Sequence, residues 1–173
     1  MFDTMESAPL AALPAPPIEP RWQWSRMPDL TAAGMYAALA ARQQVFAVEQ
    51  HCAFLDAHGH DAYAWHLLGW AGGRATPELA AYLRVLDPGR KYEDPSIGRV
   101  LTVLPHRGTG LGRVLMAEGI ARTRRTWPGT RIRIAAQKRL EAFYASLGFR
   151  TITAPYDEDG IPHVDMLIDA AAS

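Results

Sequence analysis

The chain has 173 residues, of which 49% are hydrophobic and 21% charged, a balance typical of one globular domain with a substantial core. The 18 basic and 18 acidic side chains give a formal net charge of zero, which argues against nucleic acid or an acidic membrane surface as a partner. A single cysteine, Cys52, excludes an internal disulfide and predicts a reducing, cytoplasmic compartment.

The first twenty residues differ in composition from the rest of the chain. They contain five prolines, which break any apolar helix, and Asp3 and Glu6 stand where a secretory signal peptide carries positive charge. No apolar run in the sequence approaches the ~20 residues that span a bilayer. We therefore predict a flexible Pro/Ala-rich tail over residues 1–20 and one domain over residues 21–169, with no membrane partner.

The predicted domain begins with a strand and a helix. Residues 21–25 place two tryptophans two positions apart, on one face of a short strand. Apolar residues then recur at helical spacing over 30–46, with Asp29 or Thr31 as the N-cap. The mixed segment 47–61 predicts a loop with a second short helix.

The middle of the chain predicts three strands and a helix. Residues 62–70 and 78–86 form the two strands of an expected hairpin, and residues 97–104 form a strand that stops at Pro105. A helix is expected over 111–127. Its inward side chains are predicted to be Leu111, Val114, Leu115 and Ile120.

The last part of the chain predicts a strand at 131–137, a helix at 138–148, a strand at 149–155, a turn-rich loop at 156–163 and a final strand at 163–169. Two blocks have the order strand–helix–strand, which places a parallel pair of strands inside a mixed sheet. The predicted fold class is therefore α/β, with one central mixed β-sheet flanked by helices.

A glycine-rich segment, RGTGLG over residues 107–112, joins the strand predicted at 97–104 to the helix predicted at 111–127. Closely spaced glycines leave backbone N–H groups uncovered, and the positive end of a helix points at the same place, which suits a phosphate. A Walker loop needs Lys and a hydroxyl residue after its last glycine, but Arg113 and Val114 stand there. A dinucleotide fingerprint needs an acidic residue at the end of the next strand, where this chain has Gln137.

The pattern that remains, R-x-x-G-x-G, resembles the acetyl-CoA pyrophosphate loop of the GCN5-related N-acetyltransferases (GNAT). Gln137 at the end of a strand and Tyr144 seven residues later match the second half of the family signature. Further segments resemble the ElaA-type acetyltransferases, of which EDGIPH at residues 158–163 is the most specific. Ala53 departs from that family, which usually has proline after the cysteine.

The resemblance implies a GNAT fold in which two central parallel strands splay apart and acetyl-CoA lies in the gap, with no metal. An amine acceptor, a small molecule or a peptide, would attack the thioester directly, and Tyr144 would protonate the leaving thiolate as general acid. A backbone N–H near Val103 would face the oxyanion. The implied cofactor-binding residues are Leu101, Thr102, Val103, Arg107, Gly108, Thr109, Gly110, Leu111, Gly112, Arg113 and Gln137.

The general base is open at this stage. The candidates are Glu49, His66, Glu158 and His163, with Glu49 and His163 carried forward as catalytic residues and a water chain as the alternative. Glu49 can instead pair with Arg42 or Arg84.

Several other interpretations also stay open. The cluster His51, Cys52, Asp56, His58, His60 and Asp61 matches no closed zinc pattern, so solvated loop residues near the acceptor entrance are favoured over a metal site. The acidity of the loops at 47–61 and 153–163 hints at a cationic amine. A CoA-binding sensor without catalysis is the rival function. Exposed sheet edges make a homodimer a further prediction.

Overall fold

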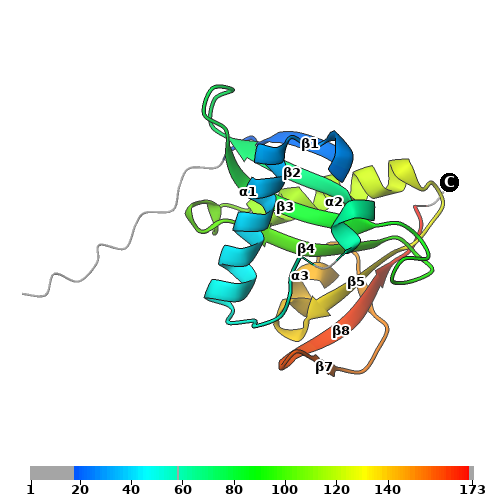
Figure 1. The fold of residues 1–173 in the computed structure, drawn as a ribbon. Coiled ribbons are helices and arrows are strands. Elements are labelled where there is room, and N and C mark those ends of the chain that lie inside the picture. Colours follow the sequence, from blue (N-terminus) through cyan, green and yellow to red (C-terminus); the bar gives the residue numbers. More distant parts are fainter. Residues whose placement is uncertain (1–17, 58, 172–173) are drawn as a thin grey trace, which may run out of the picture.

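The computed structural model describes residues 18–57 and 59–171, so most of the predicted tail, residues 1–17, lies outside the described residues. A mixed sheet of eight strands runs in the order β1-β2-β3-β4-β5-β8-β6, with β7 paired to β8 (Figure 1). This confirms the predicted fold class. The strands are β1 (Arg21–Arg26), β2 (Trp65–Ala71), β3 (Glu78–Leu86), β4 (Ser96–Thr102), β5 (Ile132–Gln137), β6 (Arg150–Thr151), β7 (Tyr156–Glu158) and β8 (Ile161–Ile168).

Helices cover both faces of the sheet (Figure 1). One face packs on α1 (Ala32–Arg42), and the other on α2 (Leu111–Thr126) and α3 (Glu141–Ala145). A π-helical segment, η2 (Gln43–Glu49), continues α1. Four 3₁₀ turns complete the described elements: η1 (Met27–Asp29), η3 (His60–Tyr63), η4 (Leu104–His106) and η5 (Lys138–Leu140). No helix in the described ranges is long and apolar enough to cross a membrane.

Local chemistry explains how the helices begin and pack. Thr31 is the N-cap of α1, because its side-chain oxygen accepts the N–H of Gly34 at 3.0 Å. The α2 helix lies so close to β3 that a Cβ at Gly119 would stand 2.6 Å from the side chain of Leu83. The prediction that Val114 faces inward is wrong, since it is 49% exposed. Met116 and Gly119, one turn apart on the buried side, fill that face instead.

The predicted loop at 156–163 is wrong as well, because it forms a β-hairpin. The strands β7 and β8 are joined by Asp159 and Gly160, which have φ angles of 55° and 80°. Positive φ at both central residues is the geometry that an Asp-Gly hairpin turn favours. The strand expected at 149–155 is short in turn, since only Arg150 and Thr151 pair with β8.

The sheet opens between its two parallel neighbours, β4 and β5. They share one bridge in the described structure, Ser96 with Arg133, although both strands continue for several residues beyond it. On the other side of β4, the register with β3 shifts between Tyr82 and Arg84, so that β4 carries one extra residue there. Arg99 lies in this bulge with a φ of 54°. A bulge bends its strand, which here accompanies the divergence of β4 from β5.

Candidate active site

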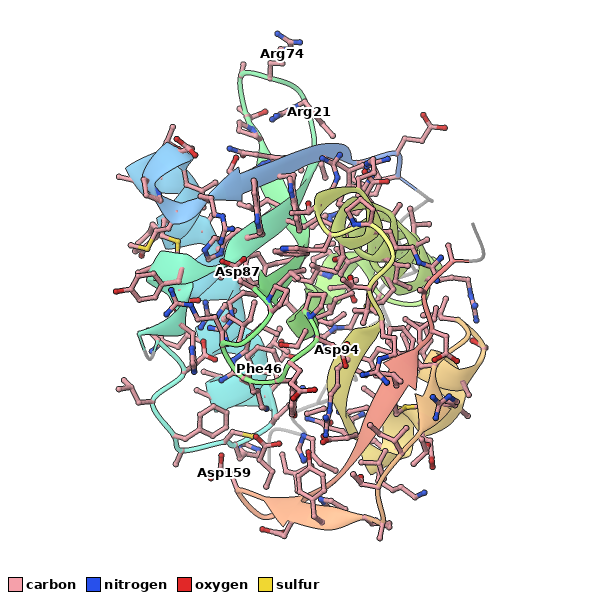
Figure 2. The ribbon with its side chains drawn as sticks, turned by 90° about the vertical axis from the view of Figure 1, so that its right-hand side faces the viewer. Arg21, Phe46, Arg74, Asp87, Asp94 and Asp159 are labelled. Atoms are coloured by element: carbon pink, nitrogen blue, oxygen red, sulfur yellow. The ribbon has the colours of Figure 1, made fainter. Side chains whose placement is uncertain are left out.

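A cavity of about 370 Å³ opens where β4 and β5 diverge. Its walls come from β4, β5, α3, the segment after α1 and the β7–β8 hairpin. Figure 2 shows two of its residues, Phe46 and Asp159, toward the end of the sheet where that hairpin lies, whereas Arg21 and Arg74 lie at the opposite end. The cavity therefore joins segments that are far apart in the sequence.

The glycine-rich loop follows β4 and η4 directly and presents open backbone. Gly108 and Gly110 have φ angles of 74° and 84°, and no atom lies within 4 Å of where a Cβ would stand at Gly108, Gly110 or Gly112. The N–H of Arg107 bonds to the carbonyl of Leu104, and the next backbone bond formed by an N–H of this segment is that of Arg113 to Gly110. Within the described structure, the five N–H groups of residues 108–112 thus make no backbone hydrogen bond outside regular elements. Leu111 and Gly112 open α2, where N–H groups have no intrahelical partner.

The side chains of this loop do different work. Thr109 Oγ1 donates to the carbonyl of His106 at 2.7 Å and closes the turn. Leu111 is buried in the core. Arg113 Nη2 donates to Ser146 Oγ at 2.9 Å, with its guanidinium over the ring of Phe143, and so ties α2 to α3.

Arg107 links the loop to β4 and to η2. Its Nε donates to the carbonyl of Thr102 at 2.9 Å, and its Nη2 lies 2.7 Å from Oε2 of Glu49. The alternative pairing of Glu49 with Arg42 or Arg84 is wrong, because Glu49 pairs with Arg107. Glu49 is not among the residues that line the cavity.

Along β4, hydrogen bonding decides which backbone groups face the gap. The N–H of Val103 donates to the carbonyl of Ala80 at 3.0 Å, so it is committed to β3 and is not the expected oxyanion donor. Bonding alternates along an antiparallel pair, which turns the N–H and carbonyl of Thr102 away from β3 and toward the gap. Leu101 points toward β3 with its backbone and is buried with its side chain.

Gln137 and Tyr144 both line the cavity, as their spacing predicted. The side chain of Gln137 donates from Nε2 to Gln50 and accepts from Nε of Arg139, each at 2.9 Å. Tyr144 is 7% exposed and packs edge-on against Phe149. Burial raises the pKa of Tyr144 to about 12, which keeps its hydroxyl protonated at neutral pH.

His163 and Glu158 also line the cavity, from β8 and β7. His163 stands opposite Gln137 in the sheet and stacks on Tyr156. Its Nδ1 lies 2.8 Å from the carbonyl of Ile161, and a carbonyl only accepts, so Nδ1 carries the proton. In the neutral form of this tautomer the lone pair is on Nε2, which lies 4.0 Å from Oε2 of Glu158.

His66, the fourth candidate base, is a core residue with no exposed surface. Its Nε2 donates to the carbonyl of Asp61 at 3.0 Å, which leaves Nδ1 to accept the hydroxyl of Tyr82 at 2.7 Å. Burial lowers the pKa of His66 and favours the neutral ring. Both nitrogens are used, and His66 does not line the cavity.

Sequence reasoning missed a buried ion network beside the cavity. Arg42, with no exposed surface, bonds through Nε to Asp56 and through Nη1 to Asp61, each at 2.7 Å. Arg84 also bonds to Asp61, and Arg99 to Asp56. No group of three metal-ligating side chains occurs in the described part of the chain. The sequence signals that could have indicated this network are Arg42, on the inward face of a helix, and Arg84, inside an apolar strand.

The model of a protein family described as "Acetyltransferase (GNAT) domain" matches residues 78–170 of this chain. The chain belongs to the GNAT acetyltransferase family. Protein ElaA of Escherichia coli K12, a GNAT relative, is 37% identical over 147 residues, which cover 84% of this chain and 94% of ElaA. A UPF0039 protein of Synechocystis is 42% identical over 150 residues, covering 87% and 96% of the two chains.

Solved GNAT-type structures agree with this assignment. An acyl-CoA N-acyltransferase from Pseudomonas aeruginosa has a TM-score of 0.81 at 38% identity, covering 87% of this chain and 99% of that one. The crystal structure of Escherichia coli ElaA has a TM-score of 0.80 at 35% identity, with coverage of 87% and 100%. These similarities confirm an ElaA-type GNAT domain.

Proposed function

We propose that this GNAT protein is an acetyl-CoA-dependent N-acetyltransferase whose acceptor is a primary amine of a small molecule or peptide. The observation that carries the proposal is that each of the two diverging strands leads to one chemical feature. Open N–H groups of residues 108–112 follow β4, and the protonated phenol of Tyr144 faces the cavity between β4 and β5. Family membership supports an acyl-CoA donor, which needs both an anion site and a place for its thioester.

The diphosphate of the donor would bind the N–H groups of residues 108–112 and the first turn of α2. Arg107 would add Nη1, since its other two nitrogens already hold Thr102 and Glu49. The amide-bearing arm of the cofactor would then run along the gap edge of β4, with Gln137 on the opposite strand.

In the proposed reaction, the amine lone pair attacks the thioester carbon and places negative charge on its oxygen. The N–H of Thr102 donates a hydrogen bond to this oxyanion, because it is the N–H that faces the gap. His163 Nε2 takes the proton that the nitrogen loses. The C–S bond then breaks, and Tyr144 gives its proton to the sulfur, whose charge is poorly solvated in the gap. Solvent returns the proton from His163 to Tyr144.

Free thiol released from acetyl-CoA with a panel of amines and peptides tests the proposal. Tyr144→Phe is expected to lower kcat by about 10²–10⁴-fold, the usual contribution of a general acid, with little change in the KM for acetyl-CoA. Tyr36→Phe, the same change at a 76% exposed site on α1, is the matched control. Equal turnover by Tyr144→Phe removes its catalytic role. Tight CoA binding without transfer to any amine indicates the rival function, a CoA-binding sensor.

We also propose a cytoplasmic location, supported by the free thiol of the buried Cys52. The predicted homodimer stays a prediction, with β1 and β6 at the two ends of the strand order as its available edges.

A further inference from the structure

The cavity extends past the gap to a wall that the proposed reaction does not use. Arg84 of β3 and Arg99 of β4 line this wall, together with the rings of Phe46 and Phe54. The two arginines belong to the buried network with Arg42, Asp56 and Asp61.

The network carries more positive than negative charge. Three guanidinium groups, Arg42, Arg84 and Arg99, share two carboxylates, Asp56 and Asp61. Its inner member, Arg42, has no exposed surface, and only Arg84 and Arg99 reach the cavity. A molecule bound in the cavity therefore meets the network at the wall that these two residues form.

Arg84 has unused hydrogen-bonding capacity. It is 5% exposed and bonds through Nη1 to Asp61 at 2.9 Å, whereas Nε and Nη2 make no hydrogen bond to any residue that the structure describes. Burial and the neighbouring Arg99 lower the pKa of Arg84, so a nearby anion would stabilise its charged form. Gly98 stands opposite Arg84 in the sheet, and no atom lies within 4 Å of where its Cβ would be. This leaves room beside the guanidinium for ligand atoms.

The bulge in β4 aims Arg99 at the same wall. Its φ of 54° is unfavourable for a residue with a side chain, and such strain is retained where the surroundings fix it. The guanidinium lies 5.7 Å from the ring centre of Phe46 and 5.6 Å from that of Phe54, and its Nε bonds to Asp56. The aromatic rings hold a cation and also give the wall an apolar surface.

The β7–β8 hairpin gives the cavity a wall of the other sign. Glu158 and Asp159 line it there, beside the Nε2 lone pair of His163, and Lys91 is 3.9 Å from Glu158. The remaining acidic residues of the two loops are engaged elsewhere. Asp56 and Asp61 bond to arginines, and Asp157 accepts the N–H of Gly160.

We infer that the acceptor is a free amino acid, with its carboxylate bound by Arg84 and Arg99 and its amine held between His163 and Glu158. This rests on the proposed N-acetyltransferase function and names its substrate class. Arginine binds a carboxylate through its N–H groups, and Nη2 of Arg84 makes no hydrogen bond to the described residues. The acidic wall then receives the ammonium group, whose first proton leaves through His163 to solvent, so that the neutral amine is free to attack.

Matched acceptors test the inference on the unmodified enzyme with acetyl-CoA. The panel holds free amino acids with apolar, polar and charged side chains, each beside its carboxamide and the amine that lacks the carboxylate. We expect kcat/KM to favour the amino acid by about tenfold or more within a pair, since a site built for a polar group rejects an analogue that lacks it. Equal or faster transfer to the carboxamides and simple amines overturns the acceptor class while upholding the acetyltransferase. No transfer to any member contradicts both.

Two variants locate the preference. Arg84→Lys keeps the charge but loses the planar pair of donors, and Arg99→Gln removes one cation; each is expected to reduce the ratio between amino acid and carboxamide toward one. Arg90→Gln, which removes an arginine lying over Tyr63 outside the cavity lining, is the control and should keep the ratio. Circular dichroism spectra and thermal midpoints show that each variant is folded. A ratio unchanged in both folded variants places the carboxylate elsewhere and overturns the assignment.

Discussion

Two regions of the molecule, the loop at 107–112 and the wall formed by Arg84 and Arg99, use different chemistry to meet a charged ligand, and of these two regions the wall lines the cavity. The loop at 107–112 offers main-chain N–H groups from one continuous segment, with glycines that keep side chains away. The wall formed by Arg84 and Arg99 offers one buried and one partly exposed guanidinium group, each paired with a carboxylate from a distant segment. Changes in the loop should therefore act mainly through steric access to a ligand, whereas changes in the wall should act through charges left without partners.

The largest effect that this comparison predicts is on stability, at the centre of the network. Arg42→Met leaves Asp56 and Asp61 each without one buried partner, which should cost about 3–5 kcal/mol of unfolding free energy. Urea denaturation measures it, with Arg125→Met, at an exposed site on α2, as the control. If both variants unfold at the same urea concentration, the network does not stabilise the folded protein.

The glycine loop should respond in the opposite way. Gly112→Ala, inside α2, should raise stability slightly through helix propensity, yet weaken binding of CoA about tenfold, because its methyl group intrudes on the anion site. Isothermal titration with CoA measures the affinity.

Gly110→Ala and Gly89→Ala separate strain from binding. Both positions have positive φ, 84° and 80°, so each substitution should cost about 1–2 kcal/mol in stability. The affinity for CoA should fall only in Gly110→Ala, because Gly89 lies outside the loop. A similar loss in both would show that general strain, rather than the anion site, controls affinity.

His66, a neutral histidine in the core, makes the stability of the protein depend on pH. The unfolded chain protonates His66 near the ordinary pKa of 6.5, whereas burial lowers that pKa in the folded chain. Stability is therefore complete above pH 6.5 and is lost progressively as the pH falls below it. Urea midpoints between pH 8 and pH 5.5 should fall across this range, and less so in a folded His66→Gln variant. Flat midpoints would contradict a neutral, buried His66.

The smallest effect is expected at Glu49 of η2, which pairs with Arg107 of the glycine loop. Because this ion pair is partly exposed, Glu49→Gln should change stability by no more than about 1 kcal/mol. Its kcat should stay within twofold, since Glu49 does not line the cavity. A loss of 100-fold or more in steady-state kcat would instead make Glu49 the general base.

The predictable part of the site is the part encoded locally. The loop at 107–112 is continuous in sequence, and the spacing of Gln137 and Tyr144 across a strand and a helix placed both at the cavity. The Asp159–Gly160 pair is also a local signal, because it favours a hairpin turn. The polar residues around it nevertheless led to the prediction of a loop.

The arginine network could not be predicted from the sequence, and the reason is physical. Arg42, Asp56 and Arg84 come from a helix, a loop and a strand, and only the packed fold brings their charges together. Hydrophobic periodicity cannot identify such residues, since it predicts apolar side chains at buried positions. His66 was a candidate base for the same reason, because its bonds to Asp61 and Tyr82 depend on tertiary packing.

A crystal structure with bound CoA tests the central claim most directly. We predict that the diphosphate lies against the N–H groups of residues 108–112 and that the sulfur lies in the gap, within hydrogen-bonding distance of the Tyr144 hydroxyl. A diphosphate bound elsewhere, or a sulfur outside the gap between β4 and β5, would contradict the account.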